Sequence, residues 1–323
     1  MKLNLILAII LLTGSAQSAT VSVMPGQSIQ ATIDAVHQGD TIEVQNGTYY
    51  ENINIAKKIV LRGIRHPVVN AQDGGSPLTL LSNGIVVEGF IITNSSALRS
   101  GINVSSLSRD NIIKGNIVGG NKGNGIDLWA SENNSILDNI ILKNMGNGIS
   151  LWSCDNIELR NNFINNNDGS GILGGCVNSS IMGNTVNANY DSGMVLLNSF
   201  NNIIADNDAS SNNKTGIMLI FGSNNSITEN TIADNINSGI SMLFSWRNKI
   251  TNNTVRNNFD GIYLGNSGEI NVLSGNIVEN NRLGMHLSSS SNNTIRNNYI
   301  INNTYNVFDD GKNRWDQDFS QGN

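Results

Sequence analysis

The stretch from Asn184 to Leu196 reads NTVNANYDSGMVL, and its pattern returns along most of the chain. An Asn is followed five residues later by a second Asn, and four residues after that by a Gly. The first Asn recurs in steps of 22 or 23 residues, at Asn116, Asn139, Asn162, Asn184, Asn207, Asn230, Asn253, Asn276 and Asn298. The second recurs at Asn121, Asn144, Asn167, Asn189, Asn212, Asn235, Asn258, Asn281 and Asn303. The Gly recurs at Gly101, Gly125, Gly148, Gly171, Gly193, Gly216, Gly239, Gly261 and Gly284. Self-similarity at such a period indicates a repeat architecture.

Each repeat unit shows the periodicity of strands. After Gly216, the apolar residues Ile217 and Leu219 stand two positions apart, and no unit spaces its apolar residues for a helix. At about 3.3 Å per residue, a unit of about 23 residues forms a coil roughly 75 Å in perimeter, which is too small to bury its own apolar face. Coils stacked about 4.8 Å apart do bury it. The sequence therefore predicts an all-β fold, a single-stranded parallel β-helix that is right-handed because parallel crossovers almost always are.

The two Asn columns have a physical reason in such a stack. Asn tolerates left-handed backbone angles at turns, and its side-chain oxygen can accept a hydrogen bond from the amide of the neighbouring coil. We therefore expect two ladders of stacked Asn side chains. An Asn-rich disordered segment is the alternative, and the regularly phased Ile, Leu and Val residues argue against it.

The ends of the chain depart from the repeat. Residues 1–19 combine Lys2, a short apolar run and small residues before the expected cleavage site, which is typical of a signal peptide; a retained N-terminal anchor is the alternative. Residues 20–40 are expected to form a cap with a short helix that begins after Ser28 and is ended by Gly39. The β-helix is expected over residues 41–304, and a turn-rich C-terminal tail over residues 305–323.

Charge limits the classes of partner. Charged residues make up 14% of the chain and the formal net charge is −6, whereas nucleic-acid binding needs a basic surface. After the signal peptide, no stretch is apolar enough to cross a bilayer. We therefore expect an extracytoplasmic protein (secreted, periplasmic or on the cell surface) that does not span the membrane after signal cleavage.

Several stretches resemble a known family. GDTIEVQNGTYYEN (Gly39 to Asn52), IVVEGFIITNS (Ile85 to Ser95), the repeated N-x-I/V…N…GI-x-L and the tail NVFDDGKNRW (Asn306 to Trp315) are similar to pectin-lyase-like β-helices. Among these the chain most resembles the NosD-type periplasmic family and its relatives with CASH domains. The resemblance implies a helper in assembling the copper site of nitrous oxide reductase alongside an ABC transporter. Copper, the transporter and the copper reductase are expected from the resemblance alone.

No copper site can be assigned from the residues. Copper ligands would be His, Met or Cys, and the three histidines, His37, His66 and His286, fall on distant coils. The methionines Met194, Met218 and Met242 lie on successive coils, one, two and three residues after their Gly. By strand alternation Met194 and Met242 point inward as core residues and Met218 points outward. We therefore predict no metal site.

Acidic residues offer a weak catalytic candidate. Asp206 and Glu229 each stand directly before a first-column Asn on adjacent coils, and Asp208 is close by. Two carboxyl groups about 5 Å apart would suit a retaining glycosidase. The neighbouring positions offer no His, however, and solvated turn acids are the simpler interpretation.

The two cysteines, Cys154 and Cys176, stand at equivalent positions of adjacent coils. Coil spacing would bring their Cα atoms to about 5 Å, within disulfide range, and an exported protein meets an oxidising setting. We predict a disulfide between them; a stacked pair of reduced core thiols is the alternative.

The outward positions two and four residues after each Gly should form a continuous strip along the stack. Its members are Asp127, Trp129, Ser150, Trp152, Leu173, Gly175, Val195, Leu197, Met218, Ile220, Ser241, Leu243, Tyr263 and Gly265. A continuous apolar strip indicates a partner surface, unless the tail from Tyr305 or the long turns cover it. Trp129 and Trp152 beside polar residues suit a sugar, whereas the aliphatic part suits a protein partner.

The sequence therefore predicts a non-catalytic binding or assembly module for a carbohydrate or protein partner. A polysaccharide-active lyase or hydrolase is the first alternative, and a structural spacer at the cell surface is the second.

Overall fold

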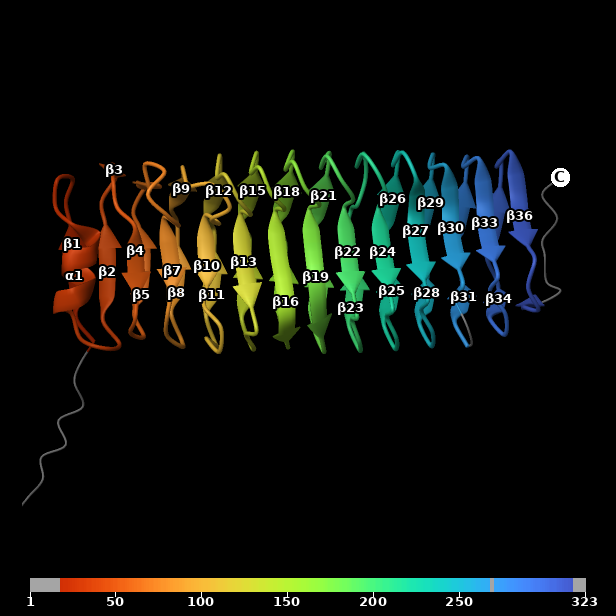
Figure 1. Cartoon of the computed structure of the whole chain (residues 1–323), viewed down its shortest axis with the longest axis horizontal. Helices are drawn as coiled ribbons and strands as arrows, with labels where there is room; N and C mark the ends of the chain where they lie inside the picture. Colours follow the sequence, from red (N-terminus) through yellow and green to blue (C-terminus); the bar gives the residue numbers. More distant parts are fainter. Residues whose placement is uncertain (1–17, 268–269, 316–323) are drawn as a thin grey trace, which may run out of the picture.

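The computed structural model describes residues 18–267 and 270–315, and it is a parallel β-helix with about 23 residues per turn. Figure 1 shows the coils stacked along one axis, with the N-terminal helix at one end and the last strands at the other. The expected signal peptide, residues 1–19, falls almost wholly outside the described residues. Within the described ranges, no helix is long and apolar enough to cross a membrane.

Each coil contributes a strand to the first sheet, which has 14 strands. Its strands are β1 (Thr20–Val23), β2 (Thr41–Val44), β5 (Val60–Gly63), β8 (Val86–Glu88), β11 (Ile112–Lys114), β14 (Ser135–Leu137), β17 (Glu158–Arg160), β20 (Ser180–Met182), β23 (Ile203–Ala205), β25 (Ser226–Thr228), β28 (Lys249–Thr251), β31 (Val272–Ser274), β34 (Thr294–Arg296) and β37 (Arg314–Trp315). All neighbours in it pair in parallel, as stacking in register requires.

The next strand of each coil lies around a corner, in a sheet that is divided in two. Seven strands form the first part: β3 (Thr48–Tyr49), β6 (Val68–Asn70), β9 (Ile91–Thr93), β12 (Ile117–Gly119), β15 (Ile140–Leu142), β18 (Phe163–Asn165) and β21 (Thr185–Asn187). Four strands form the second: β26 (Thr231–Ala233), β29 (Thr254–Arg256), β32 (Ile277–Glu279) and β35 (Tyr299–Ile301). The coil between them keeps isolated bridges at Asp208, to Thr185 on one side and to Thr231 on the other.

The third sheet has 12 strands and lies on the near face of Figure 1. Its strands are β4 (Ile53–Ile55), β7 (Leu78–Leu80), β10 (Ile102–Val104), β13 (Ile126–Trp129), β16 (Ile149–Asp155), β19 (Ile172–Val177), β22 (Met194–Leu197), β24 (Ile217–Ile220), β27 (Ser238–Leu243), β30 (Asp260–Gly265), β33 (Leu283–Ser288) and β36 (Tyr305–Asp309). β36 adds a strand to the edge of this sheet, so the described part of the tail, residues 305–315, begins one more coil and does not fold over the strip.

A short helix lies beside the first strands, as expected of a cap. Helix α1 (Ile29–Ala35) begins after Ser28, whose hydroxyl accepts a hydrogen bond from the Ala31 amide, and it buries Ile29 and Ile33. Glu51 from the next coil accepts from the Ile29 and Gln30 amides. The expected end at Gly39 was wrong, because Val36 caps the helix in an extended conformation and Gly39 (φ +95°) lies in the turn beyond it.

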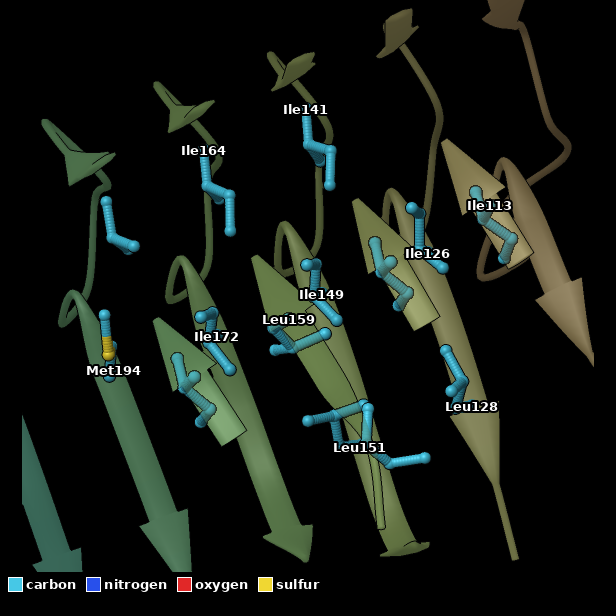
Figure 2. Close-up of a cluster of buried hydrophobic side chains, with 14 of the residues drawn as sticks. Ile113, Ile126, Leu128, Ile141, Ile149, Leu151, Leu159, Ile164, Ile172 and Met194 are labelled. Atoms are coloured by element: carbon cyan, nitrogen blue, oxygen red, sulfur yellow. The ribbon is translucent and has the colours of Figure 1, made fainter. Parts of the chain in front are cut away.

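The interior is filled by stacked aliphatic side chains. Figure 2 shows inward-pointing residues of successive coils in register, among them Ile126, Ile149, Ile172 and Met194. These side chains are fully buried. Met194 and Met242 are both fully buried, which confirms them as core residues.

Both predicted Asn ladders are present. Asn207 is typical: its backbone amide and its Nδ2 both donate to Oδ1 of Asn230, at 2.9 Å each, and Nδ2 also donates to the Ile181 carbonyl. The second column repeats this arrangement, for example from Asn212 to Asn235. Each side chain thus satisfies backbone groups that would otherwise be buried without partners.

The backbone reason given for these columns was wrong. No member of either column has a positive φ within the described residues. The left-handed residue is the one before it, as at Asp138 (φ 55°), Asn161 (φ 55°) and Asp206 (φ 54°). The columns therefore keep Asn for the ladder, and the preceding position takes the left-handed angle, often with Asn, Asp or Gly but also with Glu229, Lys143, Ala188 and Ser211.

A third ladder was missed by the sequence analysis. Seven members lie five residues before the first column, at Asn111, Asn134, Asn202, Asn225, Asn248, Asn271 and Asn293, and Asn313 extends the ladder by one more bond. Bonds such as Asn225 Nδ2 to Asn248 Oδ1, at 3.0 Å, join them. The ladder is interrupted on two adjacent coils, where Ile157 and Ser179 take the place of Asn.

Candidate functional site

The outward face of the 12-stranded sheet alternates as predicted. In β13, Ile126 and Leu128 are buried, whereas Asp127 is half-buried and Trp129 is exposed. Trp129 and Trp152 are register partners on adjacent strands. Trp129 is 56% exposed, so this indole is available to a ligand.

Two members of the strip are less accessible than expected. Ser150 lies between its register partners Asp127 and Leu173, and Ser241 between Met218 and Tyr263. Ser150 is only 1% exposed and Ser241 only 4%. Larger side chains on both sides cover these small residues, so their hydroxyls cannot be counted as ligand contacts.

A hollow of about 290 Å³ interrupts the strip. It arises where Gly175 takes the place of a side chain between the register partner Trp152 and Leu197. A Cβ at Gly175 would lie 2.5 Å from the Leu197 carbonyl oxygen, and one at Gly174 (φ +148°) would overlap the Leu151 carbonyl. The lining residues are Trp152, Ser153, Cys154, Asp155, Gly175, Cys176, Val177, Leu197 and Asn198.

The two thiols line this hollow. Cys154 and Cys176 are register partners, which confirms that they occupy equivalent positions. Both are free thiols in the structure and each is 1% exposed, so the expected disulfide is not formed there. The Cys154 thiol lies instead 3.6 Å from the Leu128 carbonyl and 3.8 Å from the Ser131 hydroxyl, beyond an irregularity in the pairing between Trp152 and Cys154.

Burial dominates the acidity of both thiols. It raises the pKa of Cys154 and raises the pKa of Cys176 to about 12. Hydrogen bonds from Ser131 to Cys154, and from Ser179 and Ser199 to Cys176, act in the opposite direction. Both cysteines therefore carry their protons at neutral pH.

Beyond the ends of strands β24 and β27, the aliphatic part of the strip adjoins a group of exposed aromatic side chains. Val195, Leu197, Met218, Ile220 and Leu243 are half-buried, as outward members of a sheet are. Directly after β24 and β27, Phe221 and Phe244 stack with ring centroids 5.1 Å apart, and Trp246 lies two residues further on. These three side chains are 40–47% exposed. Their spacing of 23 residues was the signal that would have found the stacked pair.

A polar and aromatic cluster lies at the C-terminal end of the same face. Nδ1 of His286 is 3.2 Å from a carboxylate oxygen of Asp260. The imidazole packs between Tyr263 and Phe308, at centroid distances of 4.7 and 5.2 Å. Tyr263 belongs to the predicted strip, but His286 was treated only as a scattered copper ligand, although it stands two residues after Gly284.

The three candidate catalytic acids lie elsewhere. Asp206 and Glu229 are exposed, and each has the left-handed backbone of the corner position, with φ of 54° and 57°. Asp208 accepts hydrogen bonds from Ser210 and Asn187 in the interrupted second sheet. The backbone angles of Asp206 and Glu229 are those of corner residues, and the contacts of Asp208 are those of a ladder residue.

Metal-binding side chains are sparse. Among the described residues, no group of three or more His, Cys, Asp and Glu could hold a metal ion. His37 follows the cap helix and His66 has a left-handed backbone in an early turn, on coils remote from His286. The cysteine pair is the one set of soft donors that the described register brings side by side.

Comparison with solved structures shows the same fold. The A-module of the mannuronan C-5 epimerase AlgE4 of Azotobacter vinelandii is 18% identical with a TM-score of 0.72, over 89% of this chain and 94% of that one. A mutant of the periplasmic alginate epimerase AlgG is 16% identical with a TM-score of 0.57, over 85% of this chain and 83% of that one. The pectate lyase Pel9A is 16% identical with a TM-score of 0.51, over 85% of this chain and 79% of that one. At these identities the likeness concerns the fold alone.

Family membership comes from the sequence. No curated protein sequence matches the chain. The model of one family matches residues 33–208 and 174–323, which together span nearly the whole β-helix and the end of its cap helix. The chain therefore belongs to the NosD family, described as periplasmic copper-binding protein.

Proposed function

We propose that this protein is a non-catalytic carbohydrate-binding module that acts outside the cytoplasm. The observation that carries the proposal is the hollow at Gly175, bounded by Trp152 and set beside the exposed Trp129. The periplasmic description of the family supports the location.

The geometry suits a sugar ring better than an extended peptide. Trp129 and Trp152 are register partners, so their backbones lie about one strand spacing, roughly 4.8 Å, apart along the stack. Indole rings offer a large apolar surface with one polar edge, which fits the apolar faces of a saccharide. Asp155 and Asn198 at the hollow supply hydrogen-bonding groups for hydroxyls.

The shape of the face allows a chain of several sugars. The strip runs across the 12 stacked strands, perpendicular to their direction, and no described segment crosses it. The epimerases and the lyase of similar fold are named for polysaccharide substrates, which supports a long saccharide as the ligand class.

A glycan-array or calorimetric measurement tests this proposal. Trp129→Ala combined with Trp152→Ala should lower the affinity for the best-binding glycan at least tenfold, because the stacking surface is lost. Trp246→Ala is the matched control, since it removes an exposed indole from the neighbouring corner and should leave binding unchanged. Equal losses in both variants, or no binding by the folded wild-type protein, would contradict the proposal.

The alternative to a glycan is a protein partner that binds the aliphatic part of the strip. Ile220→Asp with Leu243→Asp places two charges there without touching the tryptophans. A change in sedimentation or partner binding with intact glycan binding would move the working surface to that end.

A polysaccharide-active enzyme is the second candidate, favoured by the His286–Asp260 pair. A carboxylate that accepts from Nδ1 fixes the orientation of an imidazole and leaves Nε2 for proton transfer. Wild type and His286→Ala would be compared for cleavage or epimerisation of alginate and pectate. Turnover that disappears in His286→Ala would establish this candidate in place of the non-catalytic one.

A further inference from the structure

We propose that Cys154 and Cys176 together bind one Cu(I) ion as a pair of thiolates at the floor of the hollow. The family description names copper but assigns no residue to it. The thiols lie in the same hollow as the proposed glycan contacts but use different side chains, so Cu(I) binding and glycan binding can be tested by separate variants.

The backbone places the two cysteines side by side on adjacent strands. The cysteines are register partners on β16 and β19, and neighbouring parallel strands lie about 4.8 Å apart. Both side chains are buried, yet both line the hollow that opens at Gly175. An ion entering through this opening would meet the two thiols first.

The donor set fits Cu(I) better than other common metals. Thiolate sulfur is a soft ligand and selects Cu(I) over hard cations. A structural zinc site needs four ligands, and the described residues bring no third His, Cys, Asp or Glu to the pair. Cu(I) accepts a low coordination number, so two sulfurs can suffice for it.

The repeat itself argues that these cysteines are not merely core residues. Equivalent positions on other coils mostly hold buried serines, Ser131, Ser199, Ser245, Ser267 and Ser290, and one coil has Gly222. The hydroxyl of such a serine satisfies two backbone groups, as in Ser245, which accepts from the Gly222 amide and donates to the Leu243 carbonyl. Thiols are weak substitutes in this role.

The same two coils depart from the repeat in two more ways. Ile157 and Ser179 interrupt the third Asn ladder, and Gly174 with Gly175 removes a side chain from the strip. Departures from local consistency gather where function and not folding selects the residue. Single departures occur elsewhere, at Gly222 and Gly265, but these two coils gather several of them around one pair of thiols.

Proton and charge balance is simple. Two S–H bonds break and two S–Cu bonds form, and both protons leave to solvent, with copper staying in the Cu(I) state throughout. Burial keeps the thiols protonated until the ion arrives. The ion then neutralises one of the two thiolate charges.

The test is a competition titration of the reduced protein with Cu(I) against a coloured chelator. We expect one ion per chain, and an X-ray absorption spectrum with sulfur ligands only. Cys154→Ser and Cys176→Ser should each weaken binding at least a hundredfold. Serine is the residue that this column holds elsewhere, so both variants should fold, which their melting temperatures would check.

Met194→Leu is the control, because it removes a soft donor from the core on the next coil and should leave the affinity unchanged. Wild-type affinity in either serine variant would overturn the proposal. So would a Cys154–Cys176 disulfide that persists in the exported protein and that no treatment with mild reductant and Cu(I) opens. Neither readout depends on glycan binding, so the result is independent of the proposed function.

Discussion

Two regions of the same β-helix obey the repeat to different degrees. Between residues 202 and 293, every coil keeps its Asn in the third column. On the two coils from Ile149 to Ser179, the third column holds Ile157 and Ser179, the serine column holds cysteines, and the strip loses a side chain at Gly175. The backbone stacks in both regions, so the fold does not require the full repeat on every coil. The exceptions therefore mark the place where another requirement acts.

The regular region should show how much one ladder residue contributes. Asn230 accepts from the backbone and side-chain amides of Asn207, and donates to the Ile204 carbonyl and to Asn253. Asn230→Leu leaves several of these buried groups without partners, each costing about 1–3 kcal/mol. We expect a loss of about 4 kcal/mol in the free energy of unfolding, measured with denaturant.

Asn213 provides the control for this loss, since it follows the second column and its side chain is exposed. Asn213→Ala should change stability by less than about 0.5 kcal/mol. If Asn230→Leu and Asn213→Ala unfold alike, the ladder does not hold the coils together.

The fold could be predicted from the sequence because the same residue pattern recurs on many coils. Each Gly fixes which neighbours point inward, so the burial of Met194 and Met242 could be predicted from spacing alone. The helix end could not, because Val36 leaves the helix in an extended conformation and no side chain near it signals this. The third ladder was overlooked because Ile157 and Ser179 break its periodicity.

The candidate site was harder to predict because it lies where residues depart from the repeat. The positions of Cys154 and Cys176 followed from spacing, but the hollow above them depends on Gly175 and on the backbone of Gly174. The contact of His286 with Asp260 joins residues 26 apart on the neighbouring strands β30 and β33, three positions off the register pair Asp260–Leu283. A comparison of aligned columns cannot show such diagonal contacts.

The irregular region should bind Cu(I) more tightly as the pH rises. Burial raises the pKa of both thiols, so each must lose a proton on binding at pH 6 to 8. With two protons released, the apparent affinity should rise up to about a hundredfold per pH unit. The Asp127 carboxylate acts in the same direction as burial, because it further raises the pKa of Cys154.

Competition titrations at pH 6, 7 and 8 would measure this slope. The chelator's own protonation has to be calibrated at each pH. An affinity that is independent of pH would show that the ion is held by groups other than these thiols.

The smallest effect should come from restoring the third ladder within the irregular region. Ser179 now accepts from the Ile157 amide and donates to the Val177 carbonyl, while its own amide donates to Asn202 Oδ1. An Asn at this position keeps the acceptor and adds an Nδ2 donor, which can reach Asn202 Oδ1 as Asn225 reaches Asn248. One added buried hydrogen bond stabilises by about 1 kcal/mol.

Ser179→Asn should therefore raise the free energy of unfolding by about 1 kcal/mol, and Ser180→Asn, whose side chain points outward from β20, should leave it unchanged. Cu(I) affinity should stay within about twofold in both variants, because neither replaces a sulfur. If Ser179→Asn is more stable and binds Cu(I) as before, the interrupted ladder and the thiol pair are independent features. If Ser179→Asn folds normally but no longer binds Cu(I), the larger side chain beside Cys176 blocks the ion. The gap in the third ladder would then be part of the metal site.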